Sequence, residues 1–307
     1  MSGLPERVGV VGGGRMGAGI AHAFLMAGAN VAVVEQNATA ASEARDRILS
    51  AVASSVERGA RPPDAERLLV TVTWEALVGA ELVVEAVPEL PGLKRETLRR
   101  AEELLTPEAV LATNTSSLSI DALAEAVTRP GGFLGMHFFN PVPASELVEV
   151  VAGTATAPSA LEAAAGWVRA LGKTAIVVRD SPGFASSRLG VLLGLEAIRM
   201  VEEGVGAPED IDAAMVLGYR HPVGPLRLTD LVGLDVRLDI AEYLARELGP
   251  RFEPPELLRR MVAEGMLGRK AGRGFYAWPD AAGPDSSGPD SSGPDSSGPD
   301  GTSERPR

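Results

Sequence analysis

Two residues twelve positions apart, His137 and Glu149, have the chemistry of a general base. Both lie in apolar runs, at residues 133–139 and 147–151. If these runs are antiparallel strands joined by residues 140–146, the two side chains stand opposite each other, with Cβ atoms about 5 Å apart. A carboxylate beside an imidazole fixes the ring tautomer and stabilises the imidazolium, which suits the ring for proton abstraction. The alternative is a histidine with a purely structural role in a hairpin.

A glycine-rich loop near the N-terminus predicts a dinucleotide site. Gly12, Gly14 and Gly17 follow a strand-like run and precede a helical one. At this spacing the first glycine permits a tight turn, the second lets the backbone approach a pyrophosphate, and the third packs helix on strand. The free N–H groups of the helix then face the phosphates. We expect Met16, inside this loop, to bind the cofactor with the glycines, unless the glycines merely turn the chain.

An acid at the end of the next predicted strand indicates which dinucleotide binds. Glu35 stands 23 residues after Gly12. A carboxylate there can accept both ribose hydroxyls and repels a 2′-phosphate. The following Gln36 and Asn37 carry no positive charge. These residues favour NAD over NADP, although Glu35 could instead be an ordinary solvated residue.

Periodicity divides the chain into domains. Over residues 1–180 apolar strand-like runs alternate with helical ones, which predicts an α/β domain with a mostly parallel sheet. Strand signals stop after Asp180-Ser-Pro-Gly183, and residues 181–279 predict a smaller all-α domain with four helical runs. A helical domain rich in apolar residues often packs against its copy, so a homodimer is expected. From Gly283 the chain repeats Gly-Pro-Asp-Ser-Ser and has no apolar residue to bury, which predicts a disordered tail over residues 280–307.

Composition excludes several classes of function. The net charge of −12 argues against binding nucleic acid. The absence of cysteine excludes disulfides, thiolate metal ligands and a cysteine nucleophile, and a metal site is not expected. It also suits a reducing compartment, so we expect a cytoplasmic protein. No leader segment precedes the first strand-like run, and no uncharged run is long enough to cross a membrane.

Six motifs along the chain agree in order and spacing with those of one known enzyme family. They are Val-Gly-Gly-Gly-Arg-Met-Gly-Ala-Gly-Ile-Ala at 11–21, Val-Val-Glu-Ala-Val-Pro-Glu at 83–89, Asn-Thr-Ser-Ser-Leu-Ser-Ile at 114–120, Gly-Met-His-Phe-Phe-Asn-Pro-Val-Pro at 135–143, Asp-Ser-Pro-Gly-Phe at 180–184 and Gly-Arg-Lys-Ala-Gly-Arg-Gly-Phe-Tyr at 268–276. With these motifs the chain resembles the 3-hydroxyacyl-CoA dehydrogenases of the 3-hydroxybutyryl-CoA type, and the resemblance covers residues 7–278. It implies a Rossmann-like domain with an added strand pair and a helical dimerisation domain.

The resemblance also implies roles for individual residues. It makes His137 the general base, Glu149 its orienting partner and Ser116 a contact of the substrate oxygen. The positions that match cofactor contacts are Glu89, Lys94, Asn140 and Lys270. Each of three residues also has an alternative role: Lys94 as a solvated helix residue, Ser116 as a helix cap, and Lys270 as a surface charge.

The sequence departs from the family pattern in three places. Ser187 stands where most members have an asparagine, so we expect it at the catalytic site with a shorter hydrogen-bonding arm. Ser145-Glu146 replaces a usual Met-Lys and reverses a charge. The helix after Glu35, which is often lysine-rich and binds coenzyme A, has only Arg45, Arg47 and Arg58 as cations.

These departures bear on the identity of the substrate. The expected substrate is a short-chain 3-hydroxyacyl-CoA thioester. Alternatives are an acyl group on a carrier protein, a free hydroxy acid of the sugar-acid type, or no substrate at all in a non-catalytic NAD-binding module. The intact pair of His137 and Glu149 argues against the last. Of the other histidines, His22 is expected to be packed and His221 to lie in a turn.

Overall fold

Within residues 3–279, which the computed structural model describes, the chain forms an eight-stranded sheet with covering helices and a separate group of helices. The predicted tail lies outside these residues. The strands are β1 (Arg7–Val11), β2 (Asn30–Val34), β3 (Leu68–Thr71), β4 (Leu82–Glu85), β5 (Val110–Thr113), β6 (Phe133–Phe138), β7 (Leu147–Ala152) and β8 (Thr174–Arg179). The helices around the sheet are α1 (Arg15–Met26), α2 (Ala38–Glu57), α3 (Pro91–Glu102), α4 (Ile120–Ala124) and α5 (Pro158–Ala170).

The sheet has the strand order β3-β2-β1-β4-β5-β6-β7-β8. Strands β1 to β6 run parallel, β7 runs antiparallel to β6, and β8 runs parallel to β7. The predicted mostly parallel sheet with an added strand pair is therefore confirmed. The chain order reverses at β1, between β2 and β4. In open sheets of this kind, ligands bind beyond the carboxyl ends of the strands at such a reversal.

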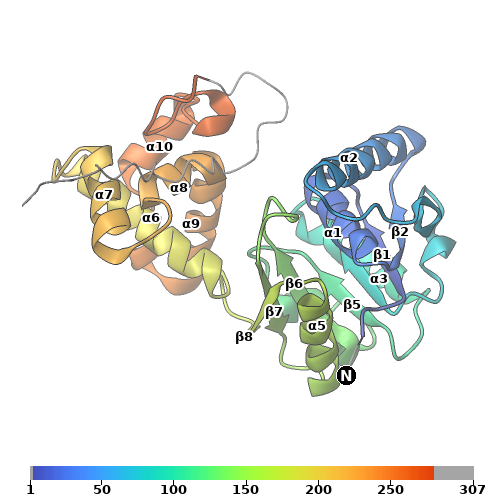
Figure 1. Cartoon of the computed structure of the whole chain (residues 1–307). Coiled ribbons are helices and arrows are strands. Elements are labelled where there is room, and N and C mark those ends of the chain that lie inside the picture. Colours follow the sequence, from blue (N-terminus) through green and yellow to red (C-terminus); the bar gives the residue numbers. More distant parts are fainter. Residues whose placement is uncertain (1–2, 280–307) are drawn as a thin grey trace, which may run out of the picture.

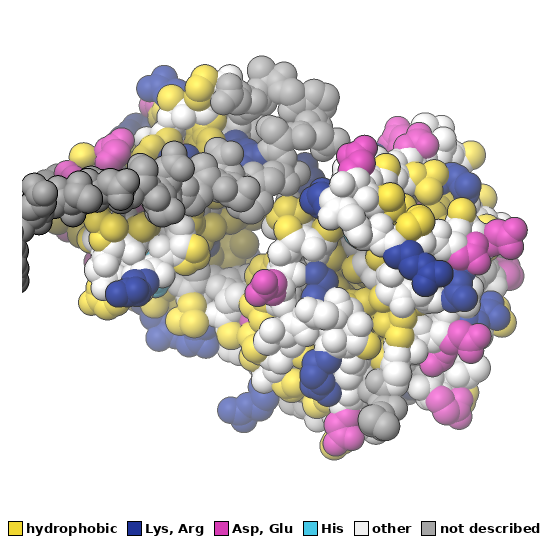
Figure 2. Space-filling model, viewed as in Figure 1, with side chains coloured by type: hydrophobic (Ala, Val, Ile, Leu, Met, Phe, Trp, Pro, Cys, Tyr) yellow, Lys and Arg dark blue, Asp and Glu magenta, His cyan; other side chains and the backbone are white. Residues whose placement is uncertain are grey.

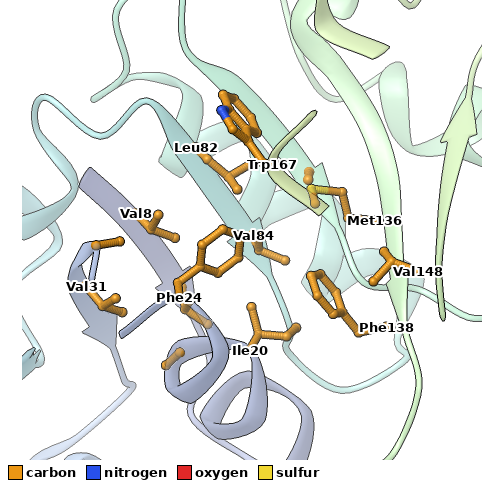
Figure 3. Close-up of a cluster of buried hydrophobic side chains, with 14 of the residues drawn as sticks. Val8, Ile20, Phe24, Val31, Leu82, Val84, Met136, Phe138, Val148 and Trp167 are labelled. Atoms are coloured by element: carbon orange, nitrogen blue, oxygen red, sulfur yellow. The ribbon is translucent and has the colours of Figure 1, made fainter. Parts of the chain in front are cut away.

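Both faces of the sheet are covered, which explains why its strands are apolar on both sides. One buried cluster joins the sheet to α1, α2 and α5, and Figure 3 shows Phe24 and Ile20 of α1 among strand side chains. A second cluster joins the other face to α3 and α4, through Leu98 and Ile120. A fully buried side chain of this size contributes about 1.5–3 kcal/mol to the free energy of folding. This packing fixes the strand ends that carry the site.

The helical domain follows β8 directly and lies to one side of the sheet domain in Figure 1. Its helices are α6 (Ser186–Glu202), α7 (Pro208–Tyr219), α8 (Pro225–Val232), α9 (Leu234–Leu248) and α10 (Glu256–Ala263). The prediction of four helical runs was wrong in one respect, because α8 is a fifth. Its sequence begins in Pro222-Val-Gly-Pro225, which resembles a turn. Pro225 instead occupies the first helical position, where its fixed φ angle is favourable.

Charged side chains are mixed over the surface that Figure 2 shows. Lys and Arg side chains lie beside Asp and Glu side chains on the visible face of the sheet domain. None of the helices in the described part of the chain has the length and apolarity that crossing a membrane requires.

Candidate active site

His137 and Glu149 lie directly opposite each other on β6 and β7, in the predicted register. His137 Nδ1 is 2.7 Å from Glu149 Oε2, and both side chains are buried. The His137 ring has two aromatic neighbours, with centroids 4.4 Å away for Phe139 and 5.9 Å away for Phe184. The carboxylate thus fixes Nδ1 and leaves Nε2 as the nitrogen that can exchange a proton with a substrate.

The Glu149 carboxylate is also bound by the start of the helical domain. Its Oε1 accepts the backbone N–H groups of Ala185 at 3.1 Å and Ser186 at 2.9 Å, and its Oε2 accepts the Ser186 hydroxyl at 2.5 Å. Burial acts to raise the pKa of Glu149, but the hydrogen bonds from His137 and Ser186 outweigh it and leave the pKa below its ordinary value. Glu149 therefore stays ionised beside His137.

The glycine loop after β1 has the shape that a pyrophosphate needs. Gly12 has a φ of 92°, and a Cβ at Gly17 would lie 1.8 Å from the Gly12 carbonyl oxygen, so both positions require glycine. A Cβ at Gly14 would have no neighbour within 4 Å, so this side of the loop is open. Gly14 precedes α1 and has no side chain to cap the first N–H groups of the helix. Met16 is the second residue of α1. These features fit NAD phosphates at the α1 N-terminus.

Glu35 follows β2, is half-buried and contacts the glycine loop. Its Oε1 accepts the Gly13 N–H at 2.6 Å, and its Oε2 accepts the Gln36 N–H at 3.0 Å. Arg47 of α2 also belongs to this region, although its sequence position did not predict a contact with the glycine loop. Its Nη1 donates to the Gly13 carbonyl at 3.2 Å and its Nη2 pairs with Glu43 at 2.9 Å. A carboxylate and a guanidinium therefore meet at the loop where a ribose would bind.

Lys94 and Glu89 join the ends of β4 and β5. Lys94 Nζ lies 2.8 Å from Glu85 Oε1 and 3.2 Å from Glu89 Oε2. Only 1% of Lys94 is exposed, so the alternative of a solvated lysine is wrong. Lys94 shares one face of α3 with Leu98 and Ala101, and all three are buried. Lys94 thus holds both acids at this edge of the sheet.

Glu89 connects this ion pair to the segment that contains Ser116. Its Oε1 accepts the Ser116 N–H at 3.0 Å and the hydroxyl of Thr115. Ser116 is not a helix cap, because Ser119 caps α4 by accepting the Ala122 N–H. The structure therefore brings Glu89, Lys94 and Ser116 together beyond the carboxyl ends of the central strands.

Asn140 is exposed, two residues after the end of β6. Asn114, for which the sequence predicted no role of its own, also belongs to this region. Its Oδ1 accepts the Phe138 N–H at 2.9 Å and so joins the end of β5 to the end of β6. The glycine loop, Glu35, the acids around Lys94 and Asn140 thus follow the carboxyl ends of parallel strands of the sheet, and His137 lies inside β6 near its end.

Comparison with known proteins agrees with this geometry. The family model described as 3-hydroxyacyl-CoA dehydrogenase, NAD binding domain, matches residues 7–181. The model of the C-terminal domain of the same family matches residues 183–278. The chain belongs to the 3-hydroxyacyl-CoA dehydrogenase family. Its cofactor is accordingly NAD, as Glu35 predicted.

Individual relatives of this 3-hydroxyacyl-CoA dehydrogenase cover most of its length. A 3-hydroxybutyryl-CoA dehydrogenase of Mycobacterium tuberculosis is 43% identical over 91% of this chain and 100% of its own. A probable 3-hydroxybutyryl-CoA dehydrogenase of Deinococcus radiodurans is 40% identical over 89% of this chain and 100% of its own. The crystal structure of (S)-3-hydroxybutyryl-CoA dehydrogenase from Ralstonia eutropha has a TM-score of 0.84 at 37% identity, over 89% of this chain and 99% of that one.

Two predicted residues of this dehydrogenase lie in the helical domain. Ser187 is the half-buried second residue of α6, next to the serine that binds Glu149. Lys270 lies in a short 3-10 turn, Arg269–Ala271, and its Nζ pairs with Asp235 Oδ2 at 2.6 Å. Its partner is thus within the helical domain and not at the glycine loop. The cofactor role of Lys270 and the catalytic role of Ser187 stay predictions.

The two other histidines lie away from the paired histidine. His22 is buried on α1, where its Nε2 lies 3.0 Å from the Ser55 hydroxyl, as expected for a packed residue. Its pKa is lowered first by burial and then by the nearby cations of Arg58 and Lys173. His221 lies between α7 and α8, as predicted for a turn.

Proposed function

We propose that this protein interconverts a short-chain 3-hydroxyacyl-CoA thioester and its 3-oxoacyl form. The observation that carries the proposal is the buried contact of 2.7 Å between His137 Nδ1 and Glu149 Oε2, at the sheet edge that also carries the glycine loop. NAD, when bound, would supply the nicotinamide that accepts a hydride from the carbon bearing the hydroxyl.

The residues of the chain then have separate roles. His137 Nε2 removes the proton of the 3-hydroxyl group, and Glu149 stabilises the imidazolium that results. Ser116 holds the substrate oxygen, and Ser187 assists it from α6. Glu89, Lys94 and Asn140 order the cofactor side of the site. In the reverse direction the imidazolium of His137 returns the proton to the 3-oxo group.

A turnover assay tests the proposal directly. NADH consumption is measured with acetoacetyl-CoA, longer 3-oxoacyl-CoA thioesters, a carrier-protein thioester and free 3-oxo acids. We expect the fastest turnover with the short CoA thioester, and His137→Gln should lower it by about 10²-fold or more while NADH binding is retained. No turnover of any thioester by the wild-type protein would contradict the proposal.

A second candidate substrate is an acyl group on a carrier protein or a free hydroxy acid. It is favoured by the acidic Glu146 and by the few cations on α2. One of these, Arg47, is already engaged with Glu43 and the Gly13 carbonyl, and Arg58 contacts the Ser55 hydroxyl at 3.4 Å. Faster turnover of the carrier-bound or free substrate in the same assay would select this candidate.

We further propose that the protein is a homodimer through its helical domain and works in the cytoplasm. Large apolar side chains are exposed on three helices of that domain: Leu189 and Leu192 of α6, Leu228, Leu231 and Val232 of α8, and Val236 of α9. Burying them against a second copy would remove this area from water. Sedimentation equilibrium should give twice the chain mass, and Leu189→Glu should shift it towards the monomer. A wild-type monomer would contradict the proposal.

A further inference from the structure

Ser186 shares a carboxylate oxygen with the candidate base. Glu149 Oε2 accepts the Ser186 hydroxyl at 2.5 Å and faces His137 Nδ1 at 2.7 Å. Its Oε1 accepts two backbone N–H groups, those of Ala185 and Ser186. A carboxylate offers about four acceptor positions, so these four contacts use all of them. Ser186 is therefore part of a closed set of partners around a buried charge.

The backbone before Ser186 adopts an uncommon conformation that presents these donors. Phe184 has a φ of 49°, in the left-handed region that residues other than glycine rarely adopt. Its side chain is buried, and its ring centroid lies 5.9 Å from that of His137. Such backbone conformations persist where the surroundings fix them, and they concentrate at active sites. The turn thus aims the hydroxyl and both N–H groups at Glu149.

We propose that Ser186 is a positioning residue that sets the basicity of the pair formed by His137 and Glu149. The inference rests on the proposed function, in which His137 must be neutral to accept the substrate proton. A hydrogen bond donated to Oε2 stabilises negative charge on that oxygen and weakens its attraction for the imidazolium proton. With the hydroxyl in place, the imidazole remains neutral to lower pH than it would beside an unshared carboxylate.

Few groups surround the Glu149 carboxylate, so the effect of the Ser186 hydroxyl on it can be tested separately. On β6, the titratable group that faces Glu149 is His137 itself. On β8, the residue in register with Glu149 is the apolar Ile176. From α6 and the turn before it come the Ser186 hydroxyl and the two N–H groups. Among the described residues, no other side chain forms a hydrogen bond or ion pair with this carboxylate, so removing the hydroxyl changes one interaction.

The first test follows the protonation of His137 by NMR and does not need turnover. The chain has only three histidines, so His137→Gln identifies the ring signals of residue 137. Ser186→Ala should raise the pH midpoint of these signals by about 0.5–1 unit, the size expected from one hydrogen bond. Ser186→Thr, which retains the hydroxyl, should restore the wild-type midpoint. Ser181→Ala is a matched control, because the Ser181 hydroxyl contacts Arg188 Nη1 at 3.2 Å instead of Glu149.

The second test uses the pH profile of kcat/KM for oxidation of 3-hydroxybutyryl-CoA. The acidic limb of Ser186→Ala should move to higher pH by the same amount, with the Ser186→Thr and Ser181→Ala profiles near that of the wild type. An unchanged or lowered midpoint in Ser186→Ala would overturn the inference, as would a shift that Ser186→Thr fails to reverse in a folded protein. An NMR shift in a protein without turnover would support the role of Ser186 and contradict the proposed function instead.

Discussion

Lys94 Nζ lies 2.8 Å from Glu85 Oε1, and both side chains are almost completely buried, at 2% and 0% exposed. Glu85 ends β4, and its Oε2 also accepts the Thr113 hydroxyl of β5 at 2.6 Å. The ion pair therefore joins α3 to two central strands where the strand order reverses. Removing one charge from such a pair leaves the other buried without its counterion, which is more costly than removing both.

Lys94→Met should lower the free energy of unfolding by about 3–5 kcal/mol, because it leaves Glu85 ionised and buried. The double variant Glu85→Gln/Lys94→Met should recover a large part of this loss, since glutamine can still accept hydrogen bonds. Urea unfolding followed by circular dichroism measures both. If Lys94→Met is as stable as the wild type, the pair has no such structural role and Lys94 serves the cofactor alone.

Glu35→Ala should weaken NAD binding and reduce the preference for NAD over NADP. The substitution removes the carboxylate that repels a 2′-phosphate and leaves Arg47, whose Nη1 lies 3.2 Å from the Gly13 carbonyl. Titration of protein fluorescence with NADH and NADPH measures the ratio of dissociation constants. The double variant Glu35→Ala/Arg47→Ala is the control, because it should bind NADPH less tightly than Glu35→Ala. Equal discrimination in Glu35→Ala and the wild type would contradict this role.

The stability that Glu149 contributes should depend on pH with a defined sign. Burial acts to raise its pKa, but the hydrogen bonds from His137 and Ser186 leave the pKa below the ordinary value of 4.5. The ionised carboxylate therefore stabilises the fold above pH 4.5, and this contribution is lost as the pH falls through the lower folded value. The stability gap between the wild type and Glu149→Gln should narrow over that range in urea unfolding. A difference in unfolding free energy that stays constant with pH would contradict the lowered pKa of Glu149. Glu75→Gln on the surface is the control.

Ser187→Asn should raise turnover of acetoacetyl-CoA by a few-fold. The carboxamide reaches further than the hydroxyl from the second position of α6, and one neutral hydrogen bond contributes about 0.5–1.5 kcal/mol. The exposed Ser50 of α2 provides the matched control Ser50→Asn, for which no change is expected. A slower Ser187→Asn variant, together with fast wild-type turnover, would mean that the serine is adapted to the site as it stands.

Local patterns predicted the parts of the site that depend on strand order and register. The glycine spacing located the loop between β1 and α1, and antiparallel pairing placed His137 opposite Glu149 because register fixes which side chains face each other. The boundaries of the helices were harder to predict from the sequence. Whether Ser186 or Ser187 faces Glu149 depends on where α6 begins to within one residue, and helix ends are uncertain at that level from sequence.

Burial of charge was harder to predict than the position of the strands. The polar sequence of α3 favours a solvent-exposed Lys94. Its burial follows only from the acids that other segments contribute. The closest of these, Glu85, ends a strand and precedes the helix by several residues. Long-range partners of this kind are set by tertiary packing, which overrides the local preference of a lysine for water.

The strand order has a consequence for redesign of the enzyme. Glu35 follows β2, whereas His137 lies in β6, and β1, β4 and β5 lie between these two strands in the sheet. The roles proposed for Glu35 in nucleotide selection and for His137 in proton transfer thus fall on strands that are not neighbours in the sheet. We therefore expect that exchange of residues 30–57, which form β2 and α2, for a counterpart of different cofactor preference would leave the pairing of His137 with Glu149 on β6 and β7 intact.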